Sequence, residues 1–135
     1  MKVLIVNADD FGYSRGINRG IAEAHDRGIV TSASLMINAP QAREAVELAR
    51  ARPALSLGIH VNFTNEGERL VEFIDPEQCR AGLEQQLGLF CDLVGQPPTH
   101  LDSHQHVHRG RTPRPIFQEL ARQYGIPLRD EPPVI

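Results

Sequence analysis

The stretch LSLGIHVNF at residues 55–63 decides the fold, because its apolar residues alternate with small or polar ones. Successive side chains of an extended strand point to opposite faces, so one face of this segment is apolar throughout. The other face carries Ser56, Gly58, His60 and Asn62. Small neighbours leave space beside His60 for an ion and a substrate. The pattern predicts a strand with an apolar face for packing and a polar face for function.

Similar segments follow one another along the chain, with amphipathic helices between them. Helix signals are clear at Asp75-Pro76, where a capping residue precedes a proline, and at the stop residues Gly95 and Gly125. We predict strands at 3–6, 31–37, 55–63 and 99–103, the beginning of a fifth at 126–129, and helices at 14–27, from Pro40 onward, at 75–95 and at 112–124. This order is typical of βαβ units and predicts an α/β fold with a parallel sheet.

The composition narrows the class of protein. With 135 residues, 41% of them hydrophobic and 23% charged, the chain suits one modest domain, residues 1–135. A net charge of −3 gives no field for nucleic acid or a membrane surface. We find neither a transmembrane run nor a signal peptide, so the expected location is cytoplasmic.

Histidines are concentrated in THLDSHQHVH at residues 99–108, where four of them and one aspartate occupy every second position. Imidazole is a common metal ligand and a proton carrier near neutral pH. His104 is the best ligand candidate, whereas His100 lies near the start of the predicted strand and is expected to be structural. His106 and His108 follow in a loop, where substrate contact, support of a ligand or solvent exposure are all open.

Polar residues also follow the first apolar run, at Asp9-Asp10. Adjacent carboxylates point in different directions, so one can bind a metal while the other accepts a proton from metal-bound water. The alternative is that one of them caps the next helix. Because the carboxyl ends of parallel strands meet at one edge, we expect Asp9, Asp10, His60 and His104 to lie close together.

Three motifs together identify a family resemblance: NADDFG at 7–12, GIHVNFT at 58–64 and THLDSHQHVH at 99–108. In this order they resemble the YdjC-like carbohydrate deacetylases, which include the chitooligosaccharide deacetylases, and the likeness runs from Met1 to about Arg129.

The resemblance implies a metal-dependent hydrolase that removes N-acetyl groups from amino sugars, on a distorted (β/α) barrel. Carried over by position, Asp9 would be the general base. The metal ligands would be Asp10, His60 and His104, and the candidates for sugar contact would be Asn62, His106 and His108. The family's ion is magnesium or zinc, and a pair of imidazoles favours zinc or another transition metal.

The chain corresponds to the N-terminal half of the family's domain. We therefore expect a partial barrel of four to five strands whose open edge favours a homodimer or larger assembly, unless the chain is a fragment of a longer product. Two other functions stay open. One is a truncated, non-catalytic metal- or sugar-binding remnant, and the other is an amidohydrolase or phosphoesterase that uses His104 and His106 as an HxH pair.

Overall fold

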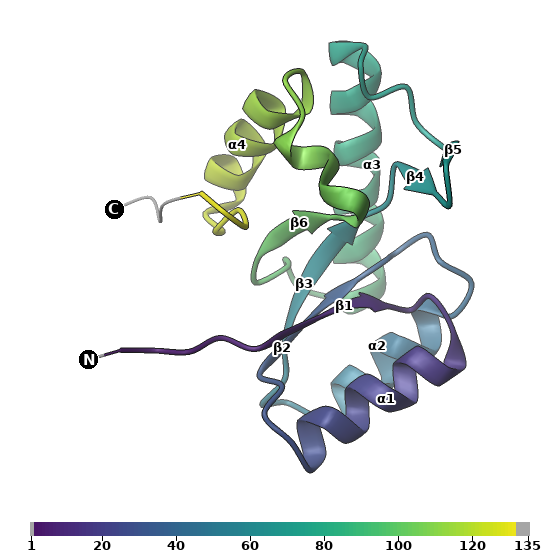
Figure 1. Ribbon diagram of the computed structural model, residues 1–135, viewed down its shortest axis with the longest axis vertical. Helices are drawn as coiled ribbons and strands as arrows, with labels where there is room; N and C mark the ends of the chain where they lie inside the picture. Colours follow the sequence, from purple (N-terminus) through teal and green to yellow (C-terminus); the bar gives the residue numbers. More distant parts are fainter. Residues whose placement is uncertain (1, 132–135) are drawn as a thin grey trace.

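A computed structural model describes residues 2–131 of the chain, and its centre is a four-stranded parallel sheet (Figure 1). The strands lie in the order β1-β2-β3-β6, and a helix connects most neighbours in the chain. The sheet strands are β1 (Asn7–Phe11), β2 (Ser32–Leu35), β3 (Ser56–Val61) and β6 (Leu101–Ser103), and the helices are α1 (Arg15–Asp26), α2 (Ala42–Arg50), α3 (Pro76–Val94) and α4 (Pro113–Tyr124). The predicted α/β fold is confirmed, and the described residues form no closed barrel.

The helix ends follow the sequence signals. The Ser14 hydroxyl accepts a hydrogen bond from the backbone N–H of Ile17 and caps α1, and Asp75 caps α3 in the same way. Gly95 and Gly125 end α3 and α4 in the left-handed conformation that glycine adopts without strain. In Figure 1, α1 and α2 lie below the sheet and α3 and α4 above it.

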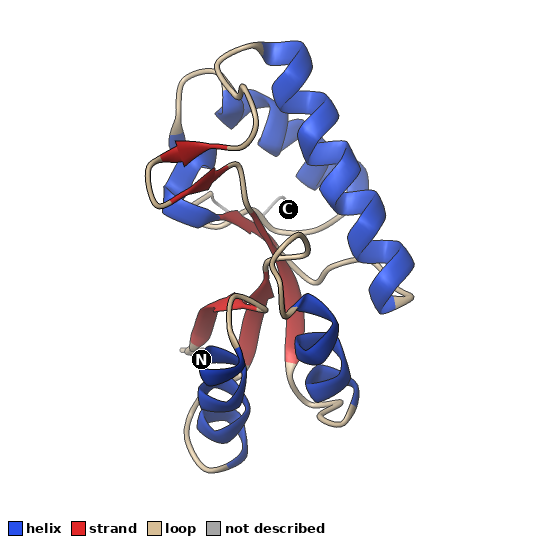
Figure 2. Cartoon of the chain, turned by 90° about the vertical axis from the view of Figure 1, so that its right-hand side faces the viewer, coloured by secondary structure: helices blue, strands red, loops and turns tan. Residues whose placement is uncertain are grey.

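The two faces of the sheet differ as the alternation predicts. Leu57, Ile59 and Val61 of β3 are buried in the apolar core, which packs against the helices. The opposite face carries small and polar side chains, and Figure 2 shows the twisted strands that present it. Its members include Asn7, Ser32, Ser34, Ser56, Gly58, His60, His100 and Asp102.

The predicted first strand at 3–6 is wrong, because pairing with β2 starts only at Asn7, opposite Ser32. Val3, Leu4 and Ile5 are 72–78% exposed. An apolar run is buried only where a second layer covers it, and no described element packs on this one. Its last residue, Val6, still accepts hydrogen bonds at its carbonyl from Thr31 and Ser32.

Smaller departures occur after β3 and β6. The fifth strand predicted at 126–129 is reduced to one parallel bridge between Leu101 and Leu128. A short antiparallel hairpin, β4 (Thr64–Asn65) and β5 (Glu68–Arg69), was not predicted. The histidine run leaves the sheet after Ser103 and continues as a 3₁₀ segment, η1 (His104–Arg109). No helix within residues 2–131 has the length and apolarity that a membrane crossing requires.

Candidate metal centre

The three predicted metal ligands meet at the carboxyl edge of the sheet. Oδ1 of Asp10 lies 3.2 Å from Nε2 of His60 and 3.1 Å from Nδ1 of His104. The two imidazole rings are 5.6 Å apart at their centroids and nearly perpendicular. Residues from β1, β3 and the start of η1 therefore converge on one carboxylate oxygen, as the rule for parallel sheets predicts.

An irregularity in β1 places Asp10. The register passes from Ala8 opposite Ala33 to Phe11 opposite Leu35, so β1 contains one residue more than β2 at this point. Asp10 has φ 62°, a left-handed conformation that costs a non-glycine residue about 1–3 kcal/mol. Bulges of this kind redirect side chains beside active sites. Here the bulge lets adjacent aspartates take different directions.

Asp102 fixes the orientation of the His60 ring, from the side opposite Asp10. Its Oδ1 lies 2.5 Å from Nδ1 of His60, and its Oδ2 accepts a hydrogen bond from Ser34 Oγ at 2.7 Å and forms an ion pair with Arg129 Nη2 at 2.9 Å. Asp102 is fully buried. A carboxylate behind a histidine fixes the ring and its tautomer so that the other nitrogen faces the metal. Nε2 of His60 is then the nitrogen directed toward Asp10.

The charges around His60 suit a cation. Burial alone would lower the pKa of His60, but hydrogen bonds to Asp10 and Asp102 and the charges of Asp102 and Asp9 together raise it to about 9. The hydrogen bond from His60 likewise holds the pKa of Asp10 below its usual value, against the effect of burial. A divalent ion bound between His60 and Asp10 would take the place of the proton on Nε2 of His60.

The donor set fits a divalent metal ion. Asp10, His60 and His104 each offer one ligand atom, and these atoms lie within 4.8 Å of one another. The nitrogen of His104 that faces Asp10 is Nδ1, and its other ring nitrogen, Nε2, is buried with no hydrogen-bond partner among the described residues. His106 belongs to a different cluster, with His108 and Asp130. That separation disfavours the HxH interpretation, which needs His104 and His106 on one ion.

Asp9 is held beside this centre by Arg129. Arg129 donates from Nη1 to Oδ2 at 2.9 Å and from Nη2 to Oδ1 at 2.6 Å, and Asn7 Nδ2 donates to Oδ1 at 2.9 Å. Burial alone would raise the pKa of Asp9, but these hydrogen bonds and the charges of His60 and Arg129 lower it. Asp9 is therefore ionised at neutral pH and can accept a proton.

His100 supports the network from within the polar face. Because Ser34 Oγ donates its proton to Asp102, Nε2 of His100 must donate to Ser34, at 2.9 Å. Thr99 Oγ1 lies 3.0 Å from the other ring nitrogen of His100. The ring covers Gly58 so closely that a Cβ there would be 2.3 Å from it. The sheet thus needs glycine at this position.

The candidates for sugar contact lie in different surroundings. Asn62 is buried. The side chain of Gln86 makes two hydrogen bonds to the Asn62 backbone: it accepts from the N–H and donates to the carbonyl. His106 is exposed, whereas His108 is buried and bonded to Ser103. Their contact with a sugar stays a prediction.

Sequence reasoning missed the roles of Asp102, Arg129 and Ser34. Asp102 stands in the quoted histidine run, and its place two residues before His104 is a signal that could have assigned it to the polar face. Arg129 follows the last helix, and only the folded chain brings it to Asp9, 120 positions earlier in sequence.

Comparisons with known proteins identify the family of this chain. A family model described as YdjC-like protein matches residues 3–135. A carbohydrate deacetylase of Brevibacillus brevis is 42% identical over 93% of this chain and 58% of its own length. A chitooligosaccharide deacetylase of Serratia marcescens is 36% identical over 95% of this chain and 59% of its own length. The chain thus spans less than two thirds of these relatives.

A solved structure gives the same result for the fold. A protein of Enterococcus faecalis whose name refers to cellobiose-phosphate cleavage superimposes with a TM-score of 0.83 and 33% sequence identity. The match covers 97% of this chain and 59% of that protein. Together with the family model, this likeness identifies the fold and its ancestry. The chain belongs to the YdjC-like protein family.

Proposed function

We propose that this chain carries the catalytic centre of a metal-dependent hydrolase that removes N-acetyl groups from amino sugars or chitooligosaccharides. One observation carries the proposal: Asp10, His60 and His104 converge on a single point, with a second carboxylate, Asp9, adjacent in the chain and separately held. Relatives named carbohydrate and chitooligosaccharide deacetylases support the substrate class.

Asp10, His60 and His104 would hold the ion. Zinc or magnesium bound there would supply Lewis acidity toward the acetamide carbonyl and acidify a water molecule, and the two imidazoles favour zinc or another transition metal. Asp102 keeps Nδ1 of His60 occupied, so that only Nε2 of this ring is available as a ligand.

Asp9 would act as the general base. A carboxylate has about four lone-pair positions. Oδ1 of Asp9 accepts from both Arg129 and Asn7, whereas Oδ2 accepts from Arg129 alone among the described residues. Oδ2 therefore keeps a position for the proton of the attacking water, while Arg129 prevents the carboxylate from turning away. Asn62, His106 and His108, which lie at or beyond the same edge of the sheet, are the candidates for sugar contact.

Acetate release from N,N′-diacetylchitobiose by the metal-loaded protein tests the proposal. We expect wild type to release acetate and Asp9→Asn to lose at least 100-fold in rate, because the amide cannot accept the proton. If wild type released no acetate at any loading of zinc or magnesium, the chain would instead be a binding-only member of the family.

We further propose a homodimer or larger assembly in the cytoplasm. β1 pairs only with β2 among the described strands, and Val3, Leu4 and Ile5 beside it expose apolar surface to solvent. A second copy that covers this edge would remove both features.

A further inference from the structure

A second group of possible metal ligands lies at the other end of η1, in His106, His108 and Asp130. Each offers one ligand atom, and these atoms lie within 4.8 Å of one another. The group shares no residue with the centre formed by Asp10, His60 and His104. The proposed deacetylation does not require this arrangement of ligands, so the cluster needs an explanation of its own.

His108 supplies the strongest sign of a missing partner. Its side chain is 2% exposed, and Nδ1 is fixed 2.7 Å from Ser103 Oγ. Nε2 is buried and has no hydrogen-bond partner among the described residues. Its nearest carboxylate oxygen, Oδ2 of Asp130, is 3.7 Å away, which is too far for a hydrogen bond. Ligands of a tetrahedral zinc ion lie about 3.3 Å apart, so this pair is within a few tenths of an ångström of ligand spacing.

A strained backbone in η1 brings His106 close to His108 and Asp130. Gln105 and His106 both have left-handed conformations, with φ 54° and 55°. Two successive non-glycine residues in this region store strain, which is typical of functional segments. Gln105 is anchored by Thr64, whose hydroxyl donates to its side chain at 2.5 Å. The ring centroids of His106 and His108 are then 6.0 Å apart, and the two rings meet nearly edge to face. His106 itself is exposed to solvent.

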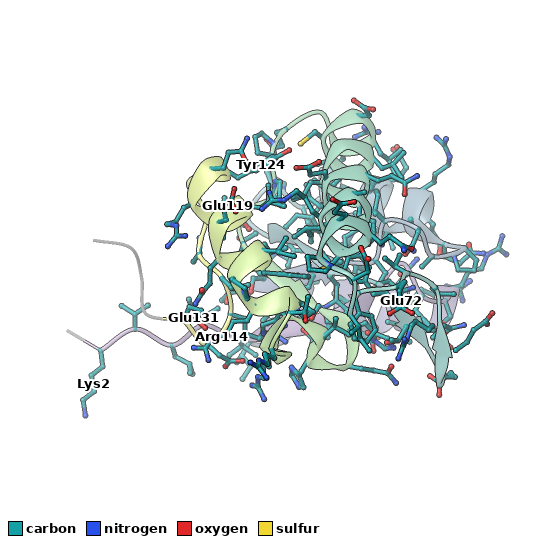
Figure 3. All side chains as sticks on the ribbon, turned by 90° about the horizontal axis from the view of Figure 1, so that it is seen from above. Lys2, Glu72, Arg114, Glu119, Tyr124 and Glu131 are labelled. Carbon is teal, nitrogen blue, oxygen red and sulfur yellow. The ribbon has the colours of Figure 1, made fainter. Side chains whose placement is uncertain are left out.

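Asp130 is held in reach of both imidazoles. Arg109 donates to Oδ2 of Asp130 from Nε at 2.9 Å and from Nη2 at 2.5 Å, so a cation bound at this oxygen would compete with the guanidinium. The neighbouring residue Glu131 pairs with Arg114 of α4 at 2.8 Å, and Figure 3 shows the two side by side. The segment that carries Asp130 is thereby fixed against α4.

We propose that His106, His108 and Asp130 bind a second cation of the zinc class. Two imidazoles and one carboxylate suit zinc or another late transition metal, and solvent at His106 leaves room for a water ligand. Such an ion would connect η1, which begins with the ligand His104, to the segment that carries Arg129. His106 and His108 would then be ligands of the ion, and Asn62 would remain as the candidate for sugar contact.

Zinc binding to the full chain tests the second site separately from the first. We block the first centre with His60→Ala and His104→Ala and measure zinc per chain by equilibrium dialysis and elemental analysis. The blocked protein should still bind one zinc ion, and adding His106→Ala should weaken that binding at least 10-fold. His25→Ala, at a histidine that bonds the Val30 carbonyl, is the matched control and should leave the affinity unchanged.

Arg109→Gln separates a metal site from a plain ion pair. If Asp130 is a ligand, loss of the competing guanidinium should tighten zinc binding several-fold, whereas Asp130→Asn should weaken it. Equal effects of the two substitutions would overturn the proposal, as would a blocked protein that binds no zinc. Should the blocked protein fail to fold, zinc titration of wild type followed by the ring-proton NMR signal of His106 gives the same answer: a shift at saturation supports the site, and an unmoved signal overturns it.

Discussion

Arg129 is the residue on which two parts of the candidate site depend. Its guanidinium binds both oxygens of Asp9 and also reaches Asp102, the carboxylate that orients His60. A single side chain thus positions the proposed base and supports a proposed metal ligand through Asp102. Its own pKa is raised, first through the hydrogen bond to Asp9, so it remains charged at any working pH.

Arg129→Gln should therefore lower acetate release and change its pH dependence. Loss of the cation raises the pKa of Asp9, so the acidic limb of the pH–rate profile should move to higher pH, and the rate should fall about 10- to 100-fold. Arg52→Gln is the matched control, because it breaks a two-point ion pair with Asp26 outside the site. An acidic limb that stayed in place would contradict the role of Arg129.

The metal-free protein should lose stability as His60 loses its proton. The pKa of His60 is raised from an ordinary 6.5 to about 9, so the folded chain binds this proton more tightly than the unfolded one. The stabilisation is complete below about pH 6.5 and is lost as the pH rises through about 9, by up to about 3 kcal/mol. Chemical denaturation at pH 6 and pH 9.5 measures it. His60→Gln should remove most of this difference, and a wild type that showed none would contradict the account.

At the scale of elements, contact between β3 and β6 depends on Gly58. A Cβ at this position would meet the His100 ring, which Ser34 and Thr99 hold in place. Gly58→Ala should lower the free energy of unfolding by about 1–3 kcal/mol, as overpacking does in other cores. Gly20→Ala, on the open surface of α1, is the matched control and should stabilise slightly through helix propensity. Equal effects on thermal unfolding would refute the close contact.

Sequence patterns predicted the elements best where the cause is local. Ser14, Asp75, Gly95 and Gly125 mark helix ends through bonds within a few residues, and these ends were confirmed. Whether residues 3–6 are buried depends on whether another element packs against them. The hydrophobic pattern of the segment itself gives no information about that. The left-handed turn at Gln105 also escaped prediction, because glutamine is not among the residue types that favour this conformation.

The residues of the candidate site also fall into two groups, those that a local sequence pattern predicts and those whose roles depend on long-range contacts. The convergence of Asp10, His60 and His104 was predictable because each lies near or just beyond the carboxyl end of a strand and parallel strands end at one edge. Asp102 and Arg129 were not, since their roles arise from contacts between distant segments. The pairing of Arg129 with Asp9 closes a span of 120 residues.

At the scale of the whole molecule, the polar face of the sheet is open on one side. A pocket of about 410 Å³ lies there, lined by residues that include Ile5, His100, Leu128 and Arg129. Beside it, Val3, Leu4 and Ile5 expose most of their apolar surface. Exposed apolar patches next to an unpaired strand edge favour association.

We therefore expect a dimer that dissociates when this surface becomes charged. Size-exclusion chromatography with light scattering should give twice the chain mass for wild type and the single mass for Leu4→Glu. Leu89→Glu, at a partly exposed leucine of α3, is the control and should remain dimeric. A wild-type protein that stayed monomeric at high concentration would contradict the proposed assembly.

The central claim is that Asp10, His60 and His104 form one metal centre, and counting bound ions tests it most directly. Elemental analysis after dialysis against zinc should show that His60→Ala and His104→Ala each bind one ion fewer per chain than wild type. His106→Ala should retain the ion of this centre. If the number of ions per chain were the same in wild type, His60→Ala and His104→Ala, the proposed centre would not exist.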